Sequence, residues 1–238
     1  IATGVWHHVL VTADRRFAES MWPTVRAAID FVLDLQADTG EIYWARGASG
    51  PLPEALLTGC ASVYPSIRCA LALADYIGDS QPEWEVALGR LGHAIAEHPE
   101  GFTEKPYHSM DWYYPILGGA VRGPAAAARI TRRWDDFVVD GLGIRCVSDR
   151  PWVTGAETCE LVLALDAMGD RRRATEQFSA MQHLRESDGS YWTGLVFADG
   201  KRWPVERTTW TGAAVILAAD ALSSTTGGSG IFRGAELP

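Results

Sequence analysis

The sequence is short of basic side chains. Its 238 residues carry 21 lysines and arginines against 30 aspartates and glutamates, which gives a formal net charge of −9. Nucleic-acid affinity depends mainly on phosphate contacts made by a clustered basic surface. The one compact basic run, at residues 171–173, is typical of the solvated first turn of a helix. The sequence therefore predicts a protein that does not bind nucleic acid.

Several other features are missing. No stretch approaches the ~20 apolar residues that span a bilayer, and no charged segment followed by an apolar one opens the chain as a signal peptide would. We therefore expect a cytoplasmic protein without a membrane span. The four cysteines form no Cys-x-x-Cys pair, and neither a phosphate-binding loop nor a Gly-x-Ser-x-Gly motif occurs. The sequence predicts no metal site and no cofactor.

What the sequence does contain is helical periodicity of two kinds. Some segments have the 3.6-residue spacing of an amphipathic helix with a polar outer face, namely 17–36, 84–97 and 171–186. Others are rich in Ala, Gly and Cys, namely 53–77, 110–121, 154–168 and 208–222, and within them residues 213–219 are apolar on every face and residues 161–165 nearly so. A helix that is apolar all round has to be covered all round. We expect the first kind to form an outer layer and the second kind an inner ring.

The connections between these segments repeat as well. Residues 38–44 and 188–192 each place an aspartate–glycine turn signal before an aromatic pair. About four helical hairpins of roughly 50 residues are visible, and such a repeat is typical of a closed or curved array. The pattern predicts an all-α fold, an α/α toroid of helical hairpins, over residues 1–222. The Gly- and Ser-rich residues 223–238 are expected to form a flexible C-terminal tail.

Two stretches resemble the glucoamylase-like six-hairpin glycosidases, which belong to the (α/α)6 toroid superfamily. The first is residues 19–73, with Met-Trp-Pro-Thr at 21–24 and Trp-Ala-Arg-Gly at 44–47. The second is residues 158–178, where a Met-Gly-Asp turn joins an inner to an outer helix. The resemblance implies a glycosidase-like toroid.

The sequence departs from that family at two positions where the family pattern has catalytic carboxylates. Trp44 is followed by Ala45 where the family has its general acid. The family's general base would fall near Trp192 and Thr193, and neither side chain can do that work. The fold can therefore be shared without the reaction.

A second resemblance is to prenyltransferase and squalene-cyclase-like proteins of actinobacterial type. Their repeats also alternate outer and inner helices, with Asp-Gly-x-Trp-type connectors such as residues 188–192. Their chemistry uses an Asp-x-Asp-Asp acid, an Asp-Asp-x-x-Asp site for Mg²⁺ or an Asp-x-Cys zinc-ligand pair, and this sequence has none of them. This resemblance implies a fold and supplies no mechanism.

Both families have six hairpins, whereas about four are visible here. Three explanations remain open. Ile1 begins partway through the toroid, or the ring is incomplete, or a partner in an oligomer closes it.

Candidate site residues lie at the starts of the inner helices and in the loops before them. Each of these segments joins an aromatic ring to a charged group, which suits a sugar pocket because rings stack on sugar C–H faces while carboxylates and arginine bind hydroxyls. Wedging of the narrow end of a helical barrel would explain the same rings. The candidates for substrate binding are Trp44, Arg46, Tyr107, His108, Trp112, Tyr113, Trp152, Trp192, Arg207 and Trp210.

Three carboxylates are candidates for catalysis. Asp111, Glu157 and Glu206 are each expected to start an inner helix beside aromatic residues. Glycoside hydrolysis needs one protonated carboxyl as acid and a second, ionised, as nucleophile or base. Acidic residues also favour the first helical turn through the helix dipole and capping alone, so capping is the alternative explanation.

These observations favour a glycoside hydrolase-like enzyme that performs acid–base chemistry on a small sugar or an oligosaccharide in an aromatic-lined funnel. One alternative is an isoprenoid enzyme of prenyltransferase or terpene-cyclase type, because an aromatic-lined cavity also suits a carbocation. The other is a non-catalytic binding or scaffold toroid, which the missing family carboxylates favour.

Overall fold

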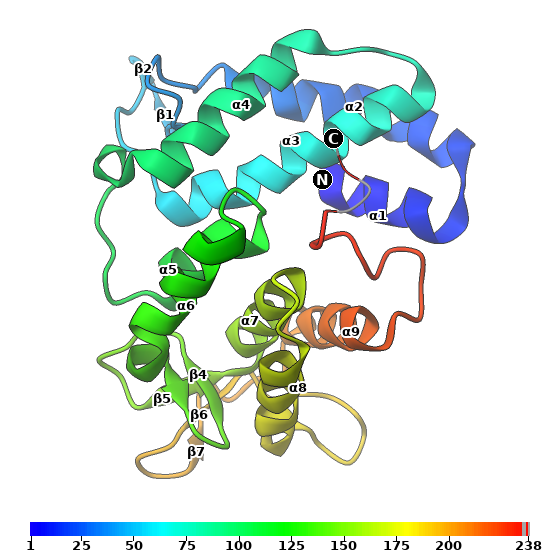
Figure 1. The fold of residues 1–238 in the computed structure, drawn as a ribbon. Coiled ribbons are helices and arrows are strands. Elements are labelled where there is room, and N and C mark those ends of the chain that lie inside the picture. Colours follow the sequence, from blue (N-terminus) through cyan, green and yellow to red (C-terminus); the bar gives the residue numbers. More distant parts are fainter. Residues whose placement is uncertain (235–236, 238) are drawn as a thin grey trace. The chain divides into compact units, whose positions relative to one another are not determined.

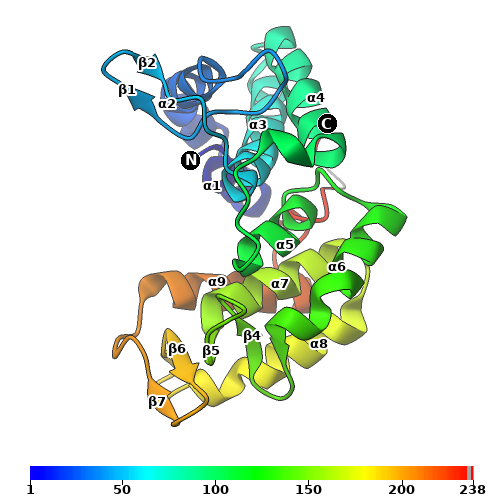
Figure 2. The same cartoon turned by 90° about the vertical axis from the view of Figure 1, so that its left-hand side faces the viewer.

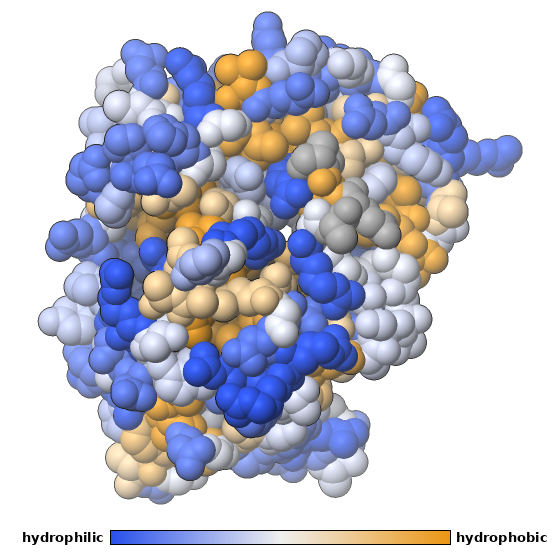
Figure 3. Space-filling view, in the orientation of Figure 1, coloured by the Kyte–Doolittle hydropathy of each residue, from blue (hydrophilic) through white to orange (hydrophobic). Residues whose placement is uncertain are grey.

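A computed structural model describes residues 1–234 and 237 (Figure 1). The chain divides into two compact units. Unit 1 consists of Ile1–Glu104, Gly118–Val121 and Thr226–Pro238, and unit 2 of Lys105–Leu117 and Arg122–Thr225. Hydrophilic residues cover much of the face drawn in Figure 3, with smaller apolar patches between them.

Unit 1 is built around one apolar helix. The helices are α1 (Ala2–Thr12), α2 (Arg15–Leu33), α3 (Leu57–Ile77) and α4 (Pro82–Glu97), followed by a 3₁₀ turn, η1 (Pro99–Gly101). α3 packs against α1, α2 and α4. Figures 1 and 2 show α3 and α4 side by side. A small antiparallel sheet of β1 (Arg46–Gly47) and β2 (Gly50–Pro51) lies between α2 and α3 in the sequence.

Local sequence signals account for where these helices begin and end. Asp14 caps α2 by accepting a hydrogen bond of 3.0 Å from the backbone N–H of Phe17, and caps of this kind contribute about 1 kcal/mol. The buried side chains of α2 recur every three or four residues, as the amphipathic pattern predicts. α3 ends at Gly78, whose φ of 87° lies in the left-handed region that favours glycine.

Among the described residues, α3 is the one helix long and apolar enough to cross a membrane by length and composition. Half of the tested window is buried inside the structure. Core helices of water-soluble proteins pass the same test, so α3 is weak evidence for a span.

Unit 2 is built around α7 (Gly155–Ala167). α5 (Ser109–Leu117), α8 (Arg171–Ala180) and α9 (Thr209–Ser223) pack against α7, while α6 (Gly123–Phe137) packs against α5. A 3₁₀ turn, η2 (Met181–Leu184), continues α8. Residues 155–166 of α7 are buried with the single exception of Glu157. This confirms that the apolar segment 154–168 forms a helix with neighbours around it.

The expectation of a purely all-α chain is wrong, because unit 2 also contains a five-stranded antiparallel sheet. Its strands are β3 (Val138–Val139), β4 (Gly143–Arg145), β5 (Trp152–Thr154), β6 (Gly194–Val196) and β7 (Lys201–Arg202), adjacent in chain order. Ile144 pairs with Thr154, and Val153 with Leu195. Strands of two or three residues are too short to show the period-2 alternation by which a strand is predicted. The chain is mostly helical with two small sheets.

The segments expected to form helices do so, with differences at their ends. The helix expected over 110–121 stops at Leu117, and Gly119 after it has a φ of 96°. α1 and α6 complete an alternation in which odd-numbered helices are apolar and even-numbered helices amphipathic. The closed toroid itself stays a prediction.

The segment expected to be a flexible tail is described up to residue 234 and at residue 237. Residues 226–234 form turns within unit 1, where Ile231 is buried. An Nη atom of Arg68 donates to the carbonyl oxygen of Gly234 at 3.3 Å. Residues 235–236 and 238, which belong to the same expected tail, lie outside the described residues.

Candidate carboxylate site

The central helix of unit 2 carries a buried carboxylate. Glu160 is only 9% exposed, and both of its carboxylate oxygens accept hydrogen bonds from α5. The hydroxyl of Tyr113 donates to one oxygen at 2.6 Å, and the hydroxyl of Tyr114 donates to the other at 2.8 Å. A charged group is buried at great cost unless it is satisfied or neutralised, so this position calls for an explanation.

The surroundings of Glu160 favour its protonated form. Burial raises the pKa of Glu160 from 4.5 to about 7, the two tyrosine hydrogen bonds lower it, and the charge of Glu157 raises it. Near neutral pH the site therefore holds a carboxyl group that can donate a proton. A pKa of this kind suits a general acid.

A second carboxylate lies one turn earlier on the same helix. Glu157 is half-buried and belongs to the first turn of α7, where the helix dipole favours a negative charge. Side chains three residues apart on a helix are neighbours, with Cβ atoms about 5–6 Å apart. Glu157 and Glu160 thus form a pair whose two members have different surroundings.

A thiol completes the surroundings of Glu157. Cys146 makes a side-chain hydrogen bond to Glu157, and burial together with the Glu157 charge raises the pKa of the thiol to about 12. Cys146 therefore stays protonated across the physiological range and serves Glu157 as a neutral donor. Burial and the Glu160 charge also raise the pKa of Cys159 on α7.

Two members of this site, Glu157 and Tyr113, were predicted from the sequence, whereas Glu160 was counted within an apolar helix. The available signal was that Glu160 directly precedes the apolar run 161–165, on a helix expected to be covered by its neighbours.

The other two carboxylates predicted to be catalytic lie elsewhere in unit 2. Asp111 does stand in the first turn of α5, where its carbonyl oxygen accepts a hydrogen bond of 2.6 Å from Arg129. Glu206 is exposed and lies in the loop before α9, and so it does not begin the helix as expected. Its carbonyl oxygen accepts the backbone N–H of Thr193 at 3.1 Å.

Trp112, predicted to bind substrate, is a core residue. It is 2% exposed, and its ring stacks on that of Phe137 with centroids 5.2 Å apart. The indole N–H donates to the carbonyl oxygen of Arg129 at 2.9 Å. The alternative explanation of packing therefore accounts for this ring.

Two other predicted aromatic residues, Trp152 and Trp192, are partly exposed and lie against a neighbouring ring or charge. The indole N–H of Trp152 donates to the carbonyl oxygen of Trp203 at 2.8 Å, and the two rings meet edge to face. The guanidinium of Arg207 lies 5.3 Å from the ring centroid of Trp192 and forms an ion pair of 3.0 Å with Asp188.

The remaining candidates of unit 2 are exposed. Trp210 lies in the first turn of α9, and Tyr107 and His108 lie in the loop before α5. His108 forms an isolated antiparallel bridge with Val147, which joins this loop to the segment that follows β4.

Two predicted substrate-binding residues belong to unit 1. Trp44 is 57% exposed, and its indole N–H donates to the carboxylate of Glu54 at 3.1 Å. Arg46 in β1 lies 4.0 Å from the carboxylate of Asp34 and 5.9 Å from the ring centroid of Phe31.

Within residues 1–234 and 237, no group of three or more His, Cys, Asp or Glu side chains is arranged to hold a metal ion.

The chain is similar to a known protein. It is 77% identical, over all of its 238 residues, to the MMP endo-(1,4)-3-O-methyl-alpha-D-mannosidase of Mycolicibacterium hassiacum. The match covers 66% of that protein, so the chain spans slightly less than two thirds of the length of its relative. No family model matches the chain.

Proposed function

We propose that this chain belongs to an endo-acting glycoside hydrolase that cleaves chains of α-(1,4)-linked 3-O-methyl-D-mannose. The observation that carries the proposal is the 77% identity to the mannosidase over the whole chain. The aromatic and charged residues expected at the inner-helix starts, together with the resemblance to glucoamylase-like glycosidases, favour the same class of function. The predicted toroid is the architecture within which we place this activity.

We assign the proton-transfer chemistry to the carboxylate pair on α7. Glu160 carries the proton near pH 7 and is the general acid, because burial holds its pKa far above that of an exposed glutamate. Glu157 is the partner carboxylate that acts on the sugar as nucleophile or on water as base. Tyr113 and Tyr114 hold the Glu160 carboxyl in place, and Cys146 donates to Glu157.

We assign sugar binding to accessible aromatic residues of unit 2. Trp152, Trp192 and Trp210 offer ring faces to sugar C–H groups, and Arg207 offers donors to hydroxyls. These residues keep the role that the sequence predicted for them.

The proposal is tested with two isosteric variants of the 238-residue chain. Glu157→Gln and Glu160→Gln each remove an ionisable group at nearly constant shape. Each is expected to lower kcat on an α-(1,4)-linked 3-O-methyl-mannose oligosaccharide by at least ~100-fold, the scale of a lost acid or base catalyst. Released reducing ends measure the rate.

A matched control guards against general effects of removing a carboxylate. Glu97 is an exposed helical glutamate at the end of α4, and Glu97→Gln is expected to retain the wild-type rate. Wild-type rates in both α7 variants would contradict the assignment of the pair. No cleavage by the unmodified chain would contradict the proposed function.

The isoprenoid and non-catalytic alternatives stay predictions that the identity to a mannosidase does not favour.

A further inference from the structure

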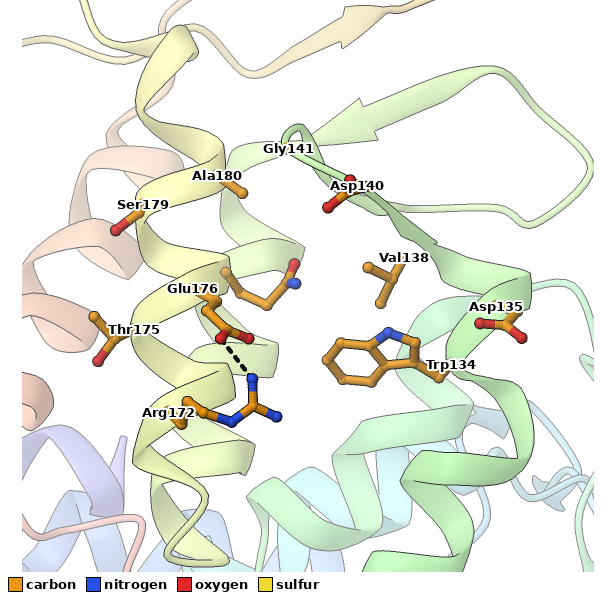
Figure 4. A pocket seen from close by; sticks show the side chains of 11 residues that line it. Trp134, Asp135, Val138, Asp140, Gly141, Arg172, Thr175, Glu176, Ser179 and Ala180 are labelled. Carbon is orange, nitrogen blue, oxygen red and sulfur yellow. Dashed lines mark hydrogen bonds and ion pairs between the residues drawn. The ribbon is translucent and has the colours of Figure 1, made fainter.

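Unit 2 carries a groove that shares no residue with the carboxylate pair or its tyrosine and thiol partners. It has a volume of about 1070 Å³ and lies between the end of α6 and α8 (Figure 4). Trp134 of α6, Val138 of β3 and Asp140 line one side, and Gln177 and Ser179 of α8 line the other. Small-molecule sites commonly measure ~300–1,000 Å³, so the groove has room for more than one sugar ring.

The aromatic wall of the groove is held in a fixed position. The guanidinium of Arg173 lies 4.8 Å from the ring centroid of Trp134, and the ring of Trp112 meets it edge to face at 6.2 Å. Figure 4 shows the Trp134 side chain extending between the two helices toward Arg172 and Glu176. A half-exposed indole fixed in this way offers a platform for the C–H face of a sugar.

The opposite wall contains an unsatisfied acceptor. Gln177 is 7% exposed, and its Oε1 atom has no hydrogen-bond partner within the described part of the chain. A buried acceptor without a donor costs about 1–3 kcal/mol. The Oε1 atom is itself buried, so the polar groups that a ligand meets on this wall are those of Arg172 and Glu176, which extend from α8 toward Trp134 (Figure 4).

The charges of the groove favour a neutral ligand. Asp135, Asp140 and Glu176 line it together with Arg172, whose Nη1 atom is paired with the Glu176 carboxylate at 2.5 Å. The carboxylates of Asp135 and Asp140, for which the described part of the chain supplies no ion-pair partner, repel phosphates and acidic sugars and accept hydrogen bonds from neutral hydroxyls.

From the size of the groove, its aromatic platform and its charge balance together, we propose that this groove is a second carbohydrate-binding site, which holds a segment of a neutral oligosaccharide away from the carboxylate pair. The choice of a methylated mannose chain as its ligand rests on the proposed function.

Equilibrium dialysis with a labelled tetrasaccharide of α-(1,4)-linked 3-O-methyl-D-mannose measures how many ligand molecules each chain binds. The Glu160→Gln chain, in which the reaction is blocked, is expected to bind two molecules per chain. Adding Trp134→Ala, which removes the platform, or Ser179→Arg, which fills the groove, is expected to leave one. Trp134 is partly packed, so Trp134→Ala could disturb the fold. Ser179 is exposed, and Ser179→Arg is therefore expected to keep the fold.

A matched control places the same change on an amphipathic helix of the other unit. Ser20 of α2 is exposed, and Ser20→Arg is expected to leave the number of bound molecules unchanged. An unchanged number in both folded groove variants would overturn the inference.

Measuring the hydrolysis rate as well as binding distinguishes a failure of this inference from a failure of the proposed function. Ser179→Arg in the otherwise unmodified chain is expected to cleave the tetrasaccharide at the wild-type rate. If the unmodified chain cleaves nothing while the groove variants still lose one bound molecule, the proposed function fails and the second site stands.

Discussion

At the scale of single residues, the most informative position is Glu160. Its carboxyl group is 9% exposed and accepts hydrogen bonds from two tyrosines. Burying such a group costs folding free energy, which a role in proton transfer would explain. Burial explains both its cost and its proposed role. Desolvation destabilises the charged form and raises the pKa of Glu160 to about 7, which suits a general acid near neutral pH.

This pKa predicts how stability depends on pH. In the unfolded chain Glu160 ionises near 4.5, and in the folded chain near 7. Between these values the folded state binds more protons than the unfolded state, so the wild-type chain loses stability as the pH rises through this window. The loss attributable to Glu160 is about 3 kcal/mol.

Urea unfolding of the wild type and of Glu160→Gln at pH 4.5 and pH 8 measures this effect. The variant has no such proton to lose, so its free energy of unfolding is expected to rise relative to that of the wild type by about 3 kcal/mol between the two pH values. Glu97→Gln is expected to follow the wild type at both. A difference between Glu160→Gln and wild type that does not change with pH would contradict the raised pKa.

At the residue scale, the sequence could predict only what a local pattern records. Glu157 stands in the first turn of its helix, as expected, and its catalytic role stays a prediction. The partnership of Glu160 with Tyr113 and Tyr114 depends on the packing of α5 against α7, which brings together residues 46 and 47 positions apart. No local pattern records such a contact.

At the scale of elements, helices were predictable and strands were not. The apolar and amphipathic periods run over three or more turns in α2, α3 and α7, whereas β3 to β7 have two or three residues each. The sheet still matters for the site, because β5 leads directly into the first turn of α7 and thereby positions Glu157.

Where β5 pairs with β6, Gly194 is expected to tolerate no larger side chain. A Cβ atom added at Gly194 would lie 2.6 Å from the carbonyl oxygen of Val153 and 2.5 Å from the indole nitrogen of Trp152. Because one of these atoms is backbone, Gly194→Ala is expected to destabilise the chain by about 1–3 kcal/mol in urea unfolding.

Gly212 on α9 is the matched control. A Cβ atom there meets nothing within 4 Å, so Gly212→Ala is expected to stabilise the helix by about 0.5–1 kcal/mol. Equal effects at the two glycines would show that the close approach at Gly194 does not matter.

At the scale of the whole molecule, the alternation of apolar and amphipathic helices is the feature that the sequence predicted best. It continues from α1 to α9 through both units. The periodicity could not predict that the chain divides into two compact units, because that depends on contacts between distant segments. The proposed reaction class came from the aromatic and acidic residues and from the resemblance to glucoamylase-like glycosidases, and it stays a proposal.

We propose above all that this chain cleaves within an α-mannoside chain by means of the carboxylate pair on α7. The most direct measurement follows product lengths over time after the 238-residue chain is mixed with a long α-(1,4)-linked 3-O-methyl-mannose oligosaccharide. We expect fragments of intermediate length from the earliest times, and none with Glu160→Gln. Release of monosaccharide alone, or the same fragments from the Glu160→Gln chain, would contradict the claim.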